Sequence, residues 1–334
     1  MKLLTLAIAS YNMEAFLDQC LESVTDPNIP NTLEVLVVND GSKDRTSRIA
    51  HVYEQMRPDI IKVIDKENGH YGSCINTALK YATGKYFRPL DADDWVNFNN
   101  LIALLNKLSS CTADLVITEF NVYKKSGIEH ITIPDKIEQD KIYDAKQFDV
   151  EKNNCTSLFA MHGMTYRTNV LNNIGLKLHT GIHYTDTEYI LLPLDNIESI
   201  IFYKLNIYQY NAMREGQSIQ KSIQHQAIDS FYILSHDLIV YYKEKAPNNN
   251  TIVRSNQRCI LRRVFYYFYV SALIFGDFHS EKLKKEMQSI ENLISDNEEL
   301  KKDAYDFTYK GIPFVKIWYK FRLRIFQYLP MFMR

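Results

Sequence analysis

The first 120 residues alternate between apolar runs and amphipathic segments, and this alternation limits the folds that the chain can adopt. Buried strands are predicted where the sequence is almost continuously apolar, at 3–9, 33–39, 60–64, 86–90 and 114–120. Helices are predicted where apolar residues recur at helical spacing, at 14–24, 44–56, 72–82 and 101–108. Alternating helices and apolar strands are typical of a mostly parallel, Rossmann-like sheet with helices on both faces. The sequence therefore predicts an α/β fold for this part of the chain.

From Asn121 onward the pattern changes. A hairpin is predicted over 123–133, and residues 144–210 mix short strands with helices. Beyond residue 217 the spacing becomes helical, over 223–242, 252–275 and 280–303. We expect residues 1–215 to form the α/β domain and 216–334 a helical C-terminal region that packs on it.

Composition excludes some classes of function. The net charge of −1 provides no general attraction to nucleic acid, so no nucleic-acid partner is expected. The 5 cysteines are scattered without metal-binding spacing, which indicates reduced thiols in the cytosol. No apolar run reaches the length of a membrane span. These features favour a cytoplasmic protein.

A cluster of carboxylates follows the fourth predicted strand, in the run Leu90-Asp91-Ala92-Asp93-Asp94. Like charges this close repel one another unless a cation or hydrogen-bond donors compensate them. Mg²⁺ and Mn²⁺ prefer oxygen ligands and share them with phosphates, so the run is a candidate metal site. The alternative is that Asp94 caps the next helix, which accounts for one carboxylate and not for three.

Other polar residues are expected at the same edge of the sheet, because ligands of parallel sheets bind beyond the carboxyl ends of the strands. The first strand ends at Ser10-Tyr11-Asn12, and the second ends at Asp40 and Gly41. Asp40 suits contacts with a base or a ribose, although a plain turn or helix cap explains this residue better when it is taken alone. Glycine-rich phosphate loops are absent from the sequence, which leaves the Asp91–Asp93 pair as the candidate diphosphate site.

In their order along the chain, these motifs resemble the opening of glycosyltransferase family 2. The motifs are Ala9-Ser10-Tyr11-Asn12 with Glu14, Glu34 to Asp44, Glu67 to Ser73 with Asn76, and Leu90 to Trp95. The resemblance implies a GT-A fold, a nucleotide-sugar donor (usually a uridine diphosphate sugar) and a Mn²⁺ or Mg²⁺ cofactor. It places Asp40 at the base, Asp91 near the ribose and metal, and Asp93 on the metal. The residues expected around the donor are Ser10, Tyr11, Asn12, Glu14, Asp40, Gly41, Asn68, Gly72, Asn76, Asp91, Ala92, Asp93 and Arg214.

The sequence departs from the family at Cys74-Ile75-Asn76, where many relatives have Ala-Arg-Asn. The missing arginine removes a possible contact with the donor. This departure leaves the identity of the donor open.

A second acidic segment, Tyr184 to Tyr189, resembles the part of the family that carries the general base. We assign that role to Asp186, with Glu188 as the second candidate, although a solvated helix face also explains Glu188. Arg214 lies in a segment that resembles the part of the family next to the donor's diphosphate. The alternative role for Arg214 is a surface salt bridge. On the acceptor side we place His162, Gln217 and Ser218; a structural role is the alternative for His162.

The tail from about Phe307 to Arg334 carries six basic residues among many aromatics and no acidic residue. Such a composition suits contact with the surface of an anionic membrane, and packing on the helical region is the alternative. Together with the resemblance to glycosyltransferase family 2, these features lead us to expect an inverting, metal-dependent glycosyltransferase at the inner face of the cell membrane. Its acceptor would be a growing surface glycan or a lipid-linked sugar. A nucleotidyltransferase and a non-catalytic sugar-nucleotide-binding protein are the alternatives.

Overall fold

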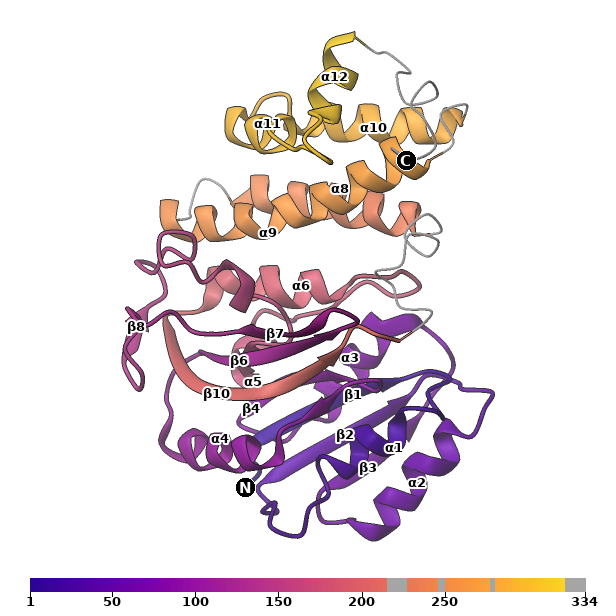
Figure 1. Ribbon diagram of the computed structural model, residues 1–334, viewed down its shortest axis with the longest axis vertical. Helices are drawn as coiled ribbons and strands as arrows, with labels where there is room; N and C mark the ends of the chain where they lie inside the picture. Colours follow the sequence, from indigo (N-terminus) through magenta and orange to yellow (C-terminus); the bar gives the residue numbers. More distant parts are fainter. Residues whose placement is uncertain (215–226, 246–249, 277–279, 322–334) are drawn as a thin grey trace. The chain divides into compact units, whose positions relative to one another are not determined.

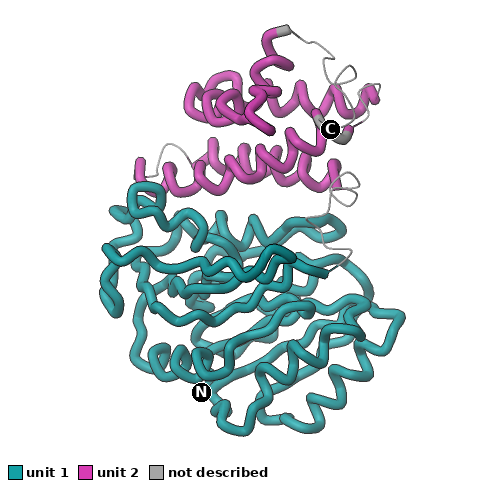
Figure 2. The backbone as a smooth tube through the Cα atoms, viewed as in Figure 1, with its two compact units in different colours: residues 1–214 teal, residues 215–334 magenta. Residues whose placement is uncertain are grey.

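A computed structural model describes residues 1–214, 227–245, 250–276 and 280–321 (Figure 1). The chain divides into two compact units, Met1–Arg214 and Glu215–Arg334 (Figure 2). The first unit is built on a mixed sheet, and the described part of the second unit is helical.

The sheet of the first unit has the strand order β3-β2-β1-β4-β9-β6-β10-β5, with β7 paired to β6 and β8 to β10. The strands are β1 Leu4–Ser10, β2 Leu33–Asn39, β3 Ile61–Asp65, β4 Tyr86–Asp91, β5 Trp95–Val96, β6 Leu115–Lys124, β7 Gly127–Ile131, β8 Ile142–Asp144, β9 Met164–Arg167 and β10 Ser199–Asn211. The central strands β1 and β2 are buried on both faces, which explains their near-continuous apolar runs.

The parallel half of the sheet, β3-β2-β1-β4, forms as the sequence predicts. Ser10 of β1 lies opposite Asn39 of β2, and Ala9 lies opposite Asp91 of β4. The carboxyl ends of these strands therefore meet at one edge, which brings together the polar residues that follow them.

The other half of the sheet is mixed. β9 runs antiparallel between β4 and β6, so β6 does not continue the parallel order directly. β10 is a strand of 13 residues where the sequence indicated only short mixed elements. Its register against β6 shifts between Tyr203 and Tyr208, and polar residues at 204 and 206 interrupt its apolar pattern. These interruptions hide a long strand from a search for regular alternation.

Helices on both faces cover the sheet of the first unit (Figure 1). They are α1 Leu17–Glu22, α2 Thr46–Met56, α3 His70–Tyr81, α4 Phe98–Ser110, α5 Thr168–Asn173 and α6 Asp186–Leu191, with short 3₁₀ turns η1 Thr156–Leu158 and η2 Leu192–Asn196. α3 packs on β1 and β2 and buries Cys74, Ile75, Ala78 and Leu79, which recur at helical spacing.

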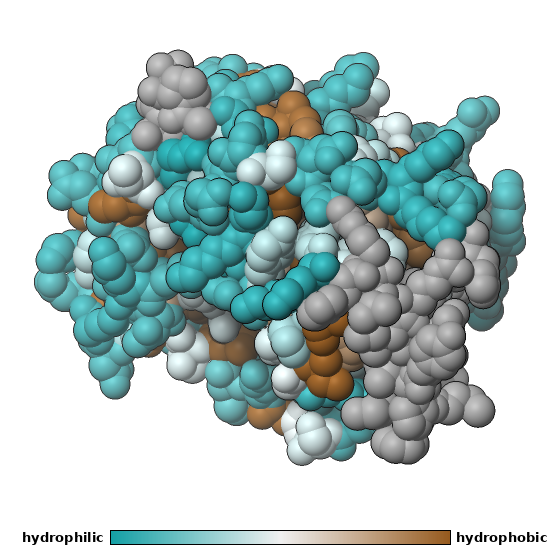
Figure 3. Space-filling view, turned by 90° about the horizontal axis from the view of Figure 1, so that it is seen from above, coloured by the Kyte–Doolittle hydropathy of each residue, from teal (hydrophilic) through white to brown (hydrophobic). Residues whose placement is uncertain are grey.

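The described elements of the second unit are α8 Ile228–Lys245, α9 Thr251–Val270, the π-helical turn η4 Ser271–Phe275, α10 Glu281–Ile294, α11 Glu298–Tyr305 and α12 Phe314–Phe321. The helix predicted over 280–303 is broken, because Asn297 caps a new helix by accepting a hydrogen bond from the N–H of Leu300 (3.0 Å). None of the helices in the described ranges is both long and apolar enough to cross a bilayer. The face that Figure 3 draws is mostly hydrophilic, with apolar residues scattered among polar ones.

The described start of the C-terminal tail packs against its own unit. In α12, Phe314, Val315 and Trp318 are buried, whereas Lys316 and Lys320 are exposed. The packing alternative therefore holds for the apolar face of α12. Residues 322–334, which complete the predicted membrane segment, lie outside the described residues.

Candidate active site

Two loops at the carboxyl edge of the sheet are bonded to each other. The backbone of Asn12 is left-handed, with φ 52°, and its Oδ1 accepts a hydrogen bond from the N–H of Lys43 (2.8 Å). Oε2 of Glu14 accepts from the N–H of Arg45 (2.9 Å). Asn12 and Glu14, both expected to contact the donor, thus have side chains bonded to the loop after β2. Here they fix the shape of the edge.

Asp40 is buried beneath this edge. Its Oδ1 accepts from Nζ of Lys66 (2.5 Å) and from the N–H of Gly69 (3.0 Å), and its carbonyl accepts from Nδ2 of Asn68 (3.1 Å). Gly41 follows with φ 73°, and a Cβ on it would lie 3.1 Å from the N of Asn68. The loops after β2 and β3 can therefore approach closely only because residue 41 is glycine.

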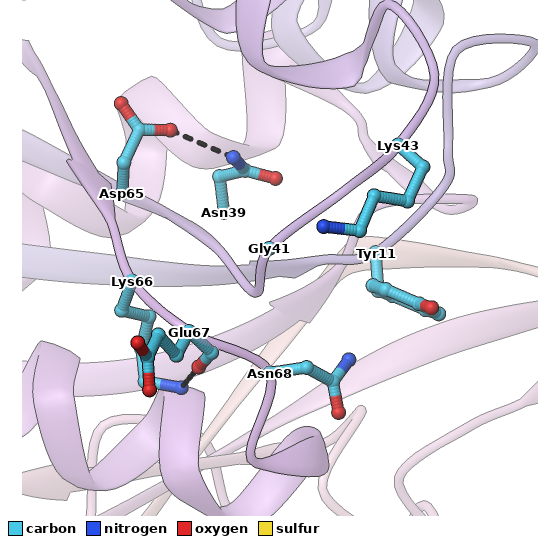
Figure 4. Close-up of a pocket in the computed structure, with 8 residues that line it drawn as sticks. All are labelled: Tyr11, Asn39, Gly41, Lys43, Asp65, Lys66, Glu67 and Asn68. Carbon is cyan, nitrogen blue, oxygen red and sulfur yellow. Dashed lines mark hydrogen bonds between the residues drawn. The ribbon is translucent and has the colours of Figure 1, made fainter.

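An open pocket of about 460 Å³ lies at these loops. Figure 4 shows Tyr11, Lys43 and Asn68 gathered around Gly41, on segments that follow β1, β2 and β3. The other lining residues are Asn39, Asp65, Lys66 and Glu67. Its size is within the range of small-molecule sites, and its aromatic and polar lining suits a nucleoside. Tyr11, which is 44% exposed, provides an aromatic ring at the surface.

The carboxylate cluster lies at the end of β4, next along the same edge. The hydroxyl of Tyr208 donates to Oδ2 of Asp94 (2.6 Å) and accepts from the N–H of Asp91 (3.1 Å). Oδ1 of Asp94 accepts from the N–H of Asn211 (2.7 Å). Burial raises the pKa of Asp91 and of Asp94 well above the ordinary range, and repulsion from the neighbouring carboxylates, Asp93 among them, adds to the shift.

The helix-cap alternative for Asp94 is wrong. The N-cap of α4 is Asn97, whose side chain accepts from the N–H of Asn100 (3.1 Å). Both oxygens of Asp94 are bonded to β10 instead.

One carboxylate oxygen each from Asp91 and Asp94 and a ring nitrogen of His162 lie within 4.8 Å of one another. The His162 ring is stacked on Tyr210 at 4.6 Å and packs edge-on against Tyr208 at 4.8 Å. Two carboxylates and an imidazole suit a divalent first-row cation such as Mn²⁺. Repulsion among the buried carboxylates supplies the reason to bind one, so these residues fit the expected cation.

Asp93 is placed differently from this trio. Its Oδ2 accepts a 2.6 Å hydrogen bond from Nε of Arg214, and both side chains are mostly shielded from solvent. The guanidinium of Arg214 also lies over the ring of Phe16, 5.5 Å from its centroid. Sequence reasoning assigned Asp93 to the metal and Arg214 to the donor; in this structure the two are each other's partner.

The second acidic segment forms the start of α6. Asp186 is close enough to the cluster for its charge to add to the effect of burial in raising the pKa of Asp91. Glu188 is buried, and its two oxygens are bonded to the ring Nδ1 (2.6 Å) and the backbone N–H (2.8 Å) of His179. The two candidate bases therefore have different surroundings.

Gly72 and Asn76 on α3 hold the segment that leads to α6. Asn76 donates to the carbonyl of Leu178 and accepts from its N–H, both at 2.8 Å. A Cβ on Gly72 would lie 2.0 Å from the carbonyl oxygen of His179. Asn76 and Gly72 were expected to contact the donor. In the structure the side chain of Asn76 and the backbone of Gly72 contact the segment before Asp186 instead.

Several residues of this region were missed by sequence reasoning, notably Tyr208, Lys66 and Arg88. Arg88 is fully buried in β4 and donates to Oγ1 of Thr118 (3.0 Å), Oγ1 of Thr165 (3.1 Å) and the carbonyl of His162. Burial lowers its pKa to about 10. An arginine inside an apolar strand was a visible sign of such a role, whereas nothing local distinguishes Tyr208.

The remaining predicted residues divide into two groups. Ser10 and Ala92 are buried at the ends of β1 and β4. Ser10 Oγ has no hydrogen-bond partner within the described part of the chain. Gln217 and Ser218 lie outside the described residues.

Comparisons with known proteins agree with this architecture. Residues 5–175 match the family model for glycosyl transferase family 2, which is just over half of the chain. The chain belongs to glycosyl transferase family 2, a family of enzymes.

Curated relatives are similar to part of the chain. It is 25% identical over 222 residues to glycosyltransferase GlyA of Streptococcus pneumoniae, covering 64% of this chain and 31% of that protein. It is 26% identical over 242 residues to the minor teichoic acid biosynthesis protein GgaB of Bacillus subtilis, covering 70% and 25%. The chain thus spans about a third or less of these two relatives.

Solved structures share the fold. S. aureus TarS 1–349 in complex with UDP-GlcNAc has a TM-score of 0.64 at 18% identity, covering 88% of this chain and 81% of that one. The mannosyltransferase PcManGT from Pyrobaculum calidifontis, in complex with GDP-Man and Mn²⁺, has a TM-score of 0.50 at 14% identity, covering 90% and 82%. The predicted α/β GT-A fold with a helical C-terminal extension is confirmed.

Proposed function

We propose that this protein is an inverting, cation-dependent glycosyltransferase that uses a nucleotide sugar, with UDP as the nucleotide. The observation that carries the proposal is the position of the carboxylate cluster at the end of β4, on the same edge as the pocket formed after β1, β2 and β3. A nucleoside in the pocket directs its diphosphate toward the cluster. The UDP-GlcNAc complex of TarS and the GDP-Man and Mn²⁺ complex of PcManGT support this class of donor.

The residues of the pocket bind and orient the nucleoside. Tyr11 offers a ring for stacking. Asp40, buried beside the pocket and held by Lys66, is the proposed acceptor for a base N–H. Asn68, which reaches the carbonyl of Asp40, lines the same pocket. Gly41 lets the ligand approach the backbone.

The carboxylate cluster would hold a divalent cation beside the diphosphate end of the donor. Asp91 and Asp93 are the proposed ligands. His162 and Asp94 each have a ligand atom within 4.8 Å of a carboxylate oxygen of Asp91, near enough to complete the set. When bound, Mn²⁺ or Mg²⁺ supplies positive charge to the leaving diphosphate. Arg214 adds a guanidinium, which matches phosphate oxygens.

Asp186 is the proposed general base, which takes the proton of the acceptor hydroxyl as that oxygen attacks the anomeric carbon. Its proximity to Asp91 supports the assignment. Glu188 is the weaker candidate because both of its oxygens are bonded to His179. Direct displacement inverts the configuration at the anomeric carbon.

The proposed acceptor is a growing surface glycan or a lipid-linked sugar. The similarity to GgaB, a minor teichoic acid biosynthesis protein, supports a polymer of the cell surface. We place the protein in the cytoplasm at the inner face of the membrane, because the exposed Lys316 and Lys320 of α12 begin a basic segment.

The direct test is a panel of UDP- and GDP-sugars, assayed for hydrolysis without acceptor and for thermal stabilisation with Mn²⁺. We expect UDP-sugars to stabilise the protein and to be hydrolysed slowly in the presence of Mn²⁺. Asp93→Ala should abolish both hydrolysis and transfer. An Asp93→Ala enzyme with normal Mn²⁺-dependent turnover would refute the site.

A further inference from the structure

The ion pair between Arg214 and Asp93 joins two residues that the proposed function assigns to different ligands. Asp93 is to bind a cation, and Arg214 is to bind the donor's diphosphate. In the present structure Nε of Arg214 donates to Oδ2 of Asp93 at 2.6 Å, and the two side chains are 21% and 11% exposed. The pair is therefore partly desolvated, where charge interactions are stronger than at an open surface.

Charge balance explains why the pair forms. Asp91, Asp93 and Asp94 lie within four consecutive positions, and Asp186 adds its charge to theirs. Arg214 opposes this repulsion at both Asp91 and Asp94. Without a cation, its guanidinium thus supplies the positive charge that the cluster requires.

We propose that Arg214 and Asp93 form a latch, in which Arg214 occupies Asp93 until the diphosphate of the nucleotide draws the guanidinium away and leaves the carboxylate to the cation. The latch rests on the proposed function, because it assumes that a nucleoside diphosphate and a divalent cation share this site.

The latch follows from competition for one carboxylate. A guanidinium and a divalent cation repel each other, so both cannot be held close to Oδ2 of Asp93 at low cost. A diphosphate offers the guanidinium several anionic oxygens in a geometry that it matches. Arg214 and the cation therefore compete for Asp93 before the nucleotide binds and act together once it is bound.

A latch couples the two ligands reciprocally. If UDP strengthens cation binding by some factor, the cation strengthens UDP binding by the same factor. Part of this coupling is the release of Asp93, in addition to direct contact between the cation and the diphosphate. Removing either partner of the latch should lower the coupling.

The decisive experiment measures UDP affinity by calorimetry in EDTA, so that no cation takes part. We expect Asp93→Asn to tighten UDP binding about tenfold, because Arg214 no longer has to leave a carboxylate; a tenfold change is within the usual range of coupling between sites. Arg214→Met should weaken UDP binding. In the Arg214→Met background, Asp93→Asn should then tighten UDP binding much less.

Simple repulsion between the Asp93 carboxylate and the diphosphate predicts a different result. It predicts that Asp93→Asn tightens UDP binding equally in both backgrounds, and that outcome would overturn the latch. So would an Asp93→Asn protein with wild-type affinity. Glu198→Gln is the matched control. It removes an exposed carboxylate that is paired with Lys146 at 2.6 Å and directly precedes β10, at the end of that strand far from Tyr208. UDP affinity should stay unchanged.

A second measurement uses Mn²⁺ alone, detected by the electron paramagnetic resonance signal of the free ion. Nucleotide-free Arg214→Met and Arg214→Gln should each bind Mn²⁺ about tenfold more tightly than the wild type, in line with the coupling expected above. Unchanged Mn²⁺ affinity in both folded variants would overturn the latch. A wild-type protein that binds neither UDP nor Mn²⁺ would instead overturn the proposed function, so the two failures are distinguishable.

Discussion

The hydroxyl of Tyr208 donates a 2.6 Å hydrogen bond to Oδ2 of Asp94, a residue 114 positions earlier in the chain. The same hydroxyl oxygen accepts from the N–H of Asp91 at 3.1 Å. One phenol on β10 thus fixes both ends of the acidic turn after β4. Because the turn carries the proposed cation ligands, its geometry depends on a strand from the other half of the sheet.

Tyr208→Phe removes this hydroxyl and keeps the ring. We expect the free energy of unfolding to fall by about 2 kcal/mol, because the buried carboxyl of Asp94 and the N–H of Asp91 lose their hydrogen-bond partner. Mn²⁺ affinity in the presence of UDP should also fall. Denaturant unfolding and Mn²⁺ titration measure the two effects. Tyr81→Phe is the control, since Tyr81 is 44% exposed; equal losses in both variants would contradict the role of Tyr208.

The two candidate bases can be separated by kinetics. Asp186→Asn should lower kcat about a thousandfold with UDP-sugar affinity nearly unchanged, because a base acts in the transition state. Glu188→Gln should instead lower thermal stability, because Glu188 binds His179 through both oxygens. If Glu188→Gln shows the kinetic loss and Asp186→Asn does not, the assignments must be exchanged.

Asn76 offers a test between donor contact and positioning. Its two bonds to Leu178 lead us to expect that Asn76→Leu lowers kcat tenfold or more by displacing the segment before Asp186. UDP affinity, measured by calorimetry, should stay within about twofold of the wild type, well under the tenfold change that 1.4 kcal/mol produces. A large loss of UDP affinity at unchanged kcat would show that Asn76 contacts the donor.

His51 makes stability depend on pH. Hydrogen bonds to Asp65 and Glu54 raise the pKa of His51 in the folded protein. Because the folded pKa exceeds the unfolded value of about 6.5, the stabilisation is complete below that pH and is lost as the pH rises through the folded pKa. Thermal unfolding of His51→Asn should lack this decline.

The effect of His51 should be small and weaker in high salt, since its side chain is 42% exposed. His236→Asn, which removes a histidine paired with Asp237 in the second unit, is the control and should keep the decline. A decline that persists unchanged in His51→Asn would assign it to another group.

The tail can be cut at two positions. A chain that ends at Phe321 keeps α12, so its helical unit should stay folded and lose binding to anionic vesicles at low salt. A chain that ends at Asp306 loses the buried Phe314, Val315 and Trp318, at roughly 1.5–3 kcal/mol for each large apolar side chain, and its helical unit should unfold. Sedimentation with vesicles and circular dichroism measure these outcomes. Undiminished vesicle binding after the cut at Phe321 would refute the anchor.

Local sequence was enough to predict the parallel half of the fold. The runs that became β1 to β4 are apolar because both faces of these strands are covered, and strands at one edge place Asp40 and Asp91 together by topology alone. The run from Leu90 to Asp94 could likewise be recognised from the sequence, because the repulsion among three carboxylates at a strand end must be compensated.

Tertiary structure decided how those residues are used. The orientation of β9 and the length of β10 depend on pairing with distant strands, which no local pattern encodes. β10 brings Tyr208 to Asp94. Arg214, which follows the turn after β10, binds Asp93, a residue 121 positions earlier in the chain. Hydrogen bonds and ion pairs act over a few ångströms of space, so folding alone determined whether Asp93 would face a cation or an arginine, and whether Asp94 would cap a helix.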